Sequence, residues 1–96
     1  MQTINAQIIE SDVRFYPDFR RSAIEFIYRC EKGEGRLSFP LKEEVVQSLF
    51  ELFETPYLNG LQGSYVRLLI DDSDRVTGLK HIVNNNGMIK YDGSCI

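Results

Sequence analysis

The stretch that decides the fold is Pro40 to Pro56, PLKEEVVQSLFELFETP, which carries the clearest helical pattern in the chain. Its apolar residues recur at spacings of three and four, which places them on one face of a helix. They are Leu41, Val45, Leu49, Leu52 and Phe53. Proline suits the first turn of a helix, and a residue that precedes proline is pushed out of the helical region. The pattern therefore predicts a helix that begins near Pro40 and ends at Thr55-Pro56.

A second apolar row, Val46 and Phe50, makes the apolar arc of this helix wider than one buried face needs. Two interpretations stay open. In the first, loops that carry Phe15, Tyr16 and Tyr57 fold over the helix and bury the row. In the second, the row is an interface with another subunit or a partner, because an exposed apolar patch of that size marks an interaction site.

Segments on both sides of the helix alternate apolar and polar residues, as half-buried strands do. The predicted strands are residues 3–9, with an irregular continuation through Val13 and Phe15, then 23–30, 36–39, 64–70, 75–83 and 88–91. Gly78 inside a strand predicts a bulge or a close approach of another backbone. Turns are expected at 16–22, 31–35, 71–74 and 84–87, with a loose tail after residue 91. Strands joined by tight turns pair antiparallel.

These elements predict an α+β fold in which an antiparallel sheet of about five or six strands packs on one amphipathic helix. Three strands precede the helix, and two or three follow it. The 96 residues form one domain, 1–96, which is long enough to build a core without metals or disulfides.

Composition excludes several classes of protein. Hydrophobic residues make up 43% and charged residues 26% of the chain, as in ordinary soluble domains. The net charge of −3 disfavours generic binding to a phosphate backbone. Two cysteines, Cys30 and Cys95, make no disulfide framework. Neither a leader sequence nor a membrane-spanning run is present, so we expect a cytoplasmic protein without a membrane partner.

Two groups of residues resemble a metal site and a catalytic site, but the surrounding sequence supports neither. Asp71, Asp72 and Asp74 could bind a cation, but a calcium loop needs a glutamate where Ile82 stands, so a solvated turn is the preferred interpretation. His81 could in principle meet Cys30 across the sheet. A partly buried strand histidine is the simpler interpretation. The sequence thus predicts no catalytic residue, no metal site and no cofactor.

One surface remains as a candidate for binding, in which arginines alternate with aromatic residues. Its members are Arg14, Phe15, Tyr16, Phe19, Arg20 and Arg21. Such residues anchor protein interfaces or stack on bases. The alternative is structural: the aromatic rings cap the core, and the arginines pair with Asp12, Asp18 or Glu25. The negative net charge favours a protein partner over a nucleic acid.

The C-terminal half, Leu61 to Arg67 (LQGSYVR) followed by Val76 to Val83 (VTGLKHIV), resembles a G-x-Y-V-R … I-x-x-I-G-H-I arrangement. That arrangement occurs in small, mostly uncharacterised proteins of phages and other bacterial mobile elements. This chain has Leu79-Lys80-His81 where the family tends to have Ile-Gly-His, and it lacks the family's glycine- and aromatic-rich segment before the helix. The resemblance implies a setting, not an activity. Short proteins of such elements often bind a host protein, as anti-CRISPR inhibitors do.

The sequence therefore predicts a small non-catalytic binding protein that blocks or modulates a host protein or a protein–nucleic-acid complex. The alternative is an accessory protein that contacts nucleic acid through its Arg/aromatic surface. A homodimer would also account for Val46 and Phe50.

Overall fold

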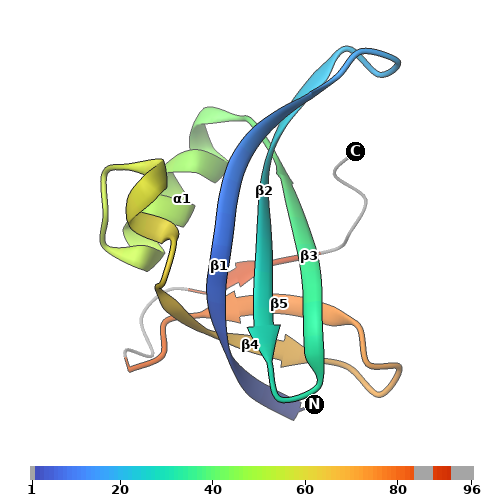
Figure 1. Cartoon of the computed structure of the whole chain (residues 1–96), viewed down its shortest axis with the longest axis vertical. Coiled ribbons are helices and arrows are strands. Elements are labelled where there is room, and N and C mark those ends of the chain that lie inside the picture. The colour runs from blue at the N-terminus through green and yellow to red at the C-terminus, as the bar shows by residue number, and fades with distance from the viewer. Residues whose placement is uncertain (1, 84–87, 92–96) are drawn as a thin grey trace.

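The computed structural model describes residues 2–83 and 88–91. Its strands are β1 (Gln2–Tyr16), β2 (Arg21–Cys30), β3 (Gly33–Pro40), β4 (Tyr65–Ile70), β5 (Val76–Lys80) and β6 (Met88–Lys90). Helix α1 (Glu43–Phe53) and a short 3-10 helix, η1 (Leu58–Leu61), lie between β3 and β4. The strands form one antiparallel sheet in the order β3-β2-β1-β4-β5-β6 (Figure 1). The predicted combination of an antiparallel sheet with one α-helix is confirmed.

The long strand β1 changes register part-way along. Ile8 lies opposite Tyr28 of β2, but the next aligned pair is Glu10 with Ile27, so Ile9 is an extra residue in β1. Such a bulge bends a strand and reverses the side to which later residues point. Ile4, Ala6 and Ile8 therefore face the core before the bulge, and Ser11, Val13 and Phe15 face the same side after it.

The core lies between this inner face of the sheet and α1. Leu49 and Leu52 of the helix are buried against residues from five strands and η1. The fully buried side chains include Ile8, Ile24, Phe26, Leu37, Leu61, Leu68 and Leu79. The predicted stripe of the helix is only partly inside, because Leu41 is exposed and Val45 and Phe53 are half-buried.

The predicted start of the helix is wrong. Pro40 is the last residue of β3, opposite Ala23, and the helix begins at Glu43 after Lys42. Pro40 fits there because β3 is an edge strand, where a missing N–H costs no ladder bond. At the other end, Glu54 closes the helix in the left-handed region, with φ 56°, before Thr55-Pro56.

Several strand limits also differ from the predictions. The expected loop 16–22 is a turn of only residues 17–20, since Tyr16 and Phe15 pair with Arg21 and Ser22. The turn between β2 and β3 is also shorter than predicted, with only residues 31–32, and β5 ends at Lys80. The predicted turn at 84–87 and the tail 92–96 lie outside the described residues.

Contacts between β3 and the residue after β6 bring the two edges of the sheet together. The Tyr91 hydroxyl accepts a hydrogen bond from the Ser38 N–H, with a distance of 3.1 Å, and the Tyr91 ring packs edge-on against Phe39. The sheet is therefore strongly curved, and β4 and β5 cross behind β2 and β3 in the view of Figure 1. The close approach of another backbone predicted at Gly78 is confirmed, because a Cβ there would lie 3.1 Å from the Ile89 carbonyl oxygen.

Gly35 has a packing role that sequence patterns do not indicate. It lies opposite Tyr28, whose ring covers it, and a Cβ on Gly35 would lie 2.7 Å from Cε2 of that ring. Burial, together with the neighbouring Cys30 and Tyr91, raises the pKa of the Tyr28 hydroxyl. The ring thus packs on the inner face only because position 35 has no side chain.

We expect Gly35→Ala to lower the free energy of unfolding by about 1–3 kcal/mol, the usual cost of forcing extra atoms into a packed site. Chemical denaturation measures the change. In a Tyr28→Ala background the same substitution should cost much less, because the ring that it displaces is gone. An equal cost in both backgrounds would show that the Tyr28 ring is not the obstacle.

Candidate functional site

Beyond the bulge, β1 and β2 leave the rest of the sheet and project as a two-stranded arm (Figure 1). This arm, residues 13–22, exists because its neighbours stop early. Strand β4 pairs only with Gln2–Gln7 of β1, and β3 ends at Pro40 opposite Ala23. The tip is a hydrogen-bonded turn in which Phe19 N–H donates to the Tyr16 carbonyl oxygen, and Arg20 has a positive φ of 52°.

Large apolar side chains are exposed along this arm. Val13 and Phe15 lie on the inner side, two residues apart, and are 46% and 59% exposed. Phe19 at the tip is 60% exposed. Leu41 extends the same surface, because its N–H donates to the carbonyl oxygen of Ser22, which pairs with Phe15. These four residues lie where the core has ended and the sheet continues.

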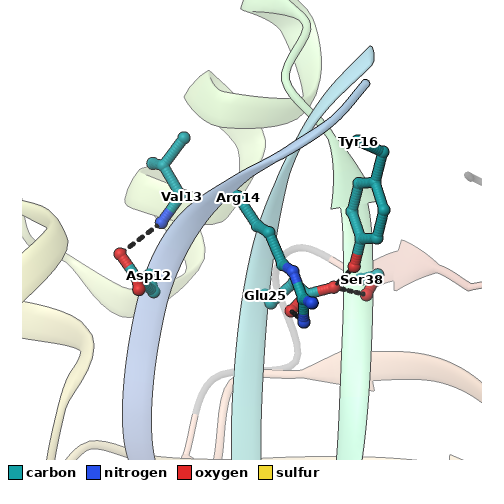
Figure 2. Close-up of polar contacts among 6 residues, drawn as sticks. All are labelled: Asp12, Val13, Arg14, Tyr16, Glu25 and Ser38. Carbon is teal, nitrogen blue, oxygen red and sulfur yellow. Dashed lines mark hydrogen bonds and ion pairs between the residues drawn. The ribbon is translucent and has the colours of Figure 1, made fainter. Parts of the chain in front are cut away.

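The outer side of the arm is polar and centres on Glu25 (Figure 2). The side chain of Glu25 is only 11% exposed and accepts hydrogen bonds from the Tyr16 hydroxyl and, at 3.0 Å, from the Ser38 hydroxyl. Arg14 lies 3.7 Å from the same carboxylate and also stacks on the Tyr16 ring, 5.2 Å from its centroid. This Glu25 cluster joins β1, β2 and β3 and fixes the base of the arm.

The six residues predicted for binding thus divide into two groups. Arg14 and Tyr16 are held by the Glu25 cluster, so one part of the structural alternative, an arginine paired with Glu25, is borne out. Phe15, Phe19, Arg20 and Arg21 are exposed on the arm. The aromatic rings do not all cap the core, as the alternative supposed, because Phe15 and Phe19 point to the surface.

A polar groove of about 510 Å³ runs beside the Glu25 cluster on the outer face of the sheet. Its walls carry charges of both signs, from Glu10, Asp12, Arg14, Glu25 and Arg36. The carboxylates outnumber the guanidinium groups, and Glu25 is already engaged by its three partners. The groove therefore presents charged side chains of both signs.

Val46 and Phe50 are half-buried and pack against the core cluster. The first interpretation, in which Phe15, Tyr16 and Tyr57 cover them, is wrong in its details. Phe15 and Tyr57 are exposed, and the Tyr16 hydroxyl is bonded to Glu25. An interface at Val46 and Phe50 stays a prediction.

His81 and Asp71, which were considered for chemistry, make local contacts. Nε2 of His81 lies 3.5 Å from the Glu54 carboxylate, while its Nδ1 accepts the Val83 N–H. Asp71 accepts the N–H groups of Arg75 and Ser73, and the Arg75 bond in particular lowers its pKa. No three His, Cys, Asp or Glu side chains in the described part of the chain are grouped to hold a metal ion. Within residues 2–83 and 88–91, no helix is both long and apolar enough to cross a membrane.

Comparison of the chain with protein-family models, curated proteins and solved structures finds no match.

Sequence reasoning missed two features of this site. Glu25 and Ser38 were not connected with Tyr16, because their meeting depends on the register of three strands. Asp12 was noted only as a partner for arginine, whereas its carboxylate accepts the Val13 N–H at 2.8 Å. The spacing of Asp12, Arg14 and Tyr16 on one side of a strand is the signal that could have indicated the cluster.

Tyr16→Phe removes one donor from the partly buried Glu25 carboxylate. We expect the free energy of unfolding to fall by about 1–3 kcal/mol, as for other lost hydrogen bonds to charged groups. Tyr57→Phe is the matched control, because Tyr57 is exposed and should tolerate loss of its hydroxyl. If both variants unfold at the same denaturant concentration as the parent chain, the Glu25 cluster does not hold the arm.

Proposed function

We propose that this chain is a non-catalytic binding protein whose arm docks on an acidic, partly apolar surface of another protein. The observation that supports this most directly is the exposure of Phe15 and Phe19 beside Arg20 and Arg21, on a hairpin that projects from the sheet. The few residues that supply most of the energy at protein interfaces are enriched in arginine and large aromatic side chains, and exposed apolar patches mark such interfaces.

The distribution of charge favours an acidic partner. Residues 13–21 contain three arginines and one aspartate, a net charge of +2, while the whole chain carries −3 and the remainder therefore −5. A basic arm on an acidic body is attracted to an acidic surface through its tip and repelled elsewhere. Such a field speeds association and orients the encounter.

The Glu25 cluster makes the arm suitable for binding. A two-stranded hairpin is marginally stable by itself in water. Here its base continues into a six-stranded sheet, and Tyr16, Arg14 and Ser38 converge on one carboxylate. An arm that is ordered before it meets its partner loses less conformational entropy on binding.

The setting is part of the proposal. The resemblance of residues 61–83 to small phage and mobile-element proteins suggests a host protein as the partner and the bacterial cytoplasm as the compartment. Blocking a macromolecular surface, as inhibitors of bacterial defence systems do, requires only contact. Neither a cofactor nor a catalytic residue enters this mechanism.

The test compares the parent chain with a triple variant, Phe19→Ala/Arg20→Ala/Arg21→Ala. Each is immobilised and used to capture proteins from nuclease-treated bacterial lysate. We expect the parent chain to retain a protein that the variant loses, and the purified partner to bind more weakly as salt rises. The melting temperature should not change, because all three side chains are exposed.

The matched control is Lys32→Ala/Arg75→Ala/Tyr57→Ala, which removes two basic residues and one aromatic ring that are also exposed but lie outside the arm. It should bind as the parent chain does. Equal loss in both triple variants would contradict docking through the arm. A parallel capture from untreated lysate tests the nucleic-acid alternative, which retention in untreated lysate alone would support.

A further inference from the structure

From Asp12 to Tyr16, no other described strand pairs with the edge of β1 that faces away from β2. On that side, β4 pairs with β1 only as far as Gln7 among the described residues. Ile8 then makes two main-chain hydrogen bonds, with Gly63 and Ser64. Residues 12–16 pair only with β2 among the described strands. Open edges of this kind are templates for another strand, and proteins usually protect them.

The hydrogen bonds at the base of the arm show which main-chain groups point to this open edge. The Leu41 N–H donates to the Ser22 carbonyl oxygen, so Ser22 and Ile24 of β2 direct their polar groups toward β3. The alternate residues Ala23 and Glu25 direct their main-chain groups toward β1, where they lie opposite Arg14 and Asp12. The main-chain N–H and C=O of Val13 must then point away from β2. The Val13 N–H does donate to Asp12 Oδ1 on that side (Figure 2).

The sequence along this edge is complementary to itself. If two copies pair antiparallel with Val13 opposite Val13, Asp12 of each copy lies opposite Arg14 of the other. Asp12 and Arg14 are on the same side of the strand, so both ion pairs form on one face. We propose that the chain forms a symmetric homodimer through this edge, with the two-fold axis at Val13.

Three features of this edge are unfavourable in the monomer, and such a dimer would remove them. Asp12 lies directly opposite Glu25 in β2, and like charges in that position are unfavourable. Val13 and Phe15 are exposed apolar side chains. Within the described residues, the Val13 N–H donates to the side chain of the neighbouring Asp12 and to no other strand. A second copy brings an arginine to Asp12, covers the apolar residues and offers a carbonyl oxygen to the Val13 N–H.

This association involves no host partner. It would cover Phe15, but its test and the lysate test of the proposed function, which changes Phe19, Arg20 and Arg21, can fail separately. Phe19 and Arg20 at the tip lie outside the segment centred on Val13. In the single chain, Asp12 protects the edge by holding the Val13 N–H. Dimerisation replaces that local bond with pairing between two main chains.

A charge exchange tests the proposal with purified protein, by sedimentation velocity over a concentration series. The parent chain should dimerise reversibly. Asp12→Arg places arginine against arginine, and Arg14→Asp places aspartate against aspartate, so the dissociation constant of each variant should rise at least tenfold. An equimolar mixture of the two should recover the dimer, because every opposed pair at positions 12 and 14 is again of opposite sign.

Two further variants separate this outcome from misfolding. Val13→Pro removes an N–H that β2 does not use, so the fold should persist by circular dichroism while the dimer is lost. Arg75→Asp makes the same change of charge as Arg14→Asp at an exposed position away from the edge and should leave dimerisation unchanged.

A parent chain that stays monomeric at every concentration would overturn the proposal. So would a dimer that Asp12→Arg and Val13→Pro leave intact, since that interface would lie elsewhere. A mixture of the charge variants that remains monomeric would contradict the register centred on Val13.

Discussion

The extra residue in β1 is the constraint on which the rest of the structure depends. Without Ile9 as a bulge, the alternation that buries Ile4, Ala6 and Ile8 would continue with Glu10 and Asp12 toward the core. With it, the charged residues turn to the outer face and the inner face keeps Ser11, Val13 and Phe15. The bulge also falls where β1 loses its pairing with β4. The same strand therefore pairs within the curved body of the sheet before the bulge and forms one side of the projecting arm after it.

The two faces of the arm follow from that change of side. Arg14 and Tyr16 reach Glu25 only because they share the outer face with it, and Ser38 of β3 completes the group from the next strand. The inner face keeps the apolar residues that the core no longer covers. The arm is in this way anchored by polar contacts on one side and exposes apolar side chains on the other, and the proposed function is built on this difference.

Local patterns predict the elements of this fold well and their relations poorly. Periodicity locates the middle of the helix, and each segment predicted as a strand overlaps an observed strand, because a single face decides the burial of each residue. Pro40 misled the prediction of the helix start, since proline is equally suited to the end of an edge strand. Pro17 and Asp18 correctly indicate a turn, but its length is set by the pairing of Tyr16 with Arg21.

The candidate site was predicted as a set of residues and not as an arrangement. Arginines beside aromatic rings are visible in sequence, whereas the division between anchored Arg14 and Tyr16 and exposed Phe19 and Arg20 depends on register. Adjacent Ile8 and Ile9 do not reveal which of them is the extra residue. Contacts that join Tyr16, Glu25 and Ser38 across three strands cannot be inferred before those strands are aligned.

The register beyond the bulge can be measured directly by nuclear Overhauser contacts in solution. Opposed residues of an antiparallel pair that exchange no hydrogen bonds have the closest Cα atoms, about 4.5 Å apart, and so give strong Hα–Hα contacts. The structure predicts such contacts for Val13 with Ile24 and for Phe15 with Ser22. Contacts of Asp12 with Ile24 and of Arg14 with Ser22 would mean that β1 has no bulge, and would contradict this account of the arm and its two faces.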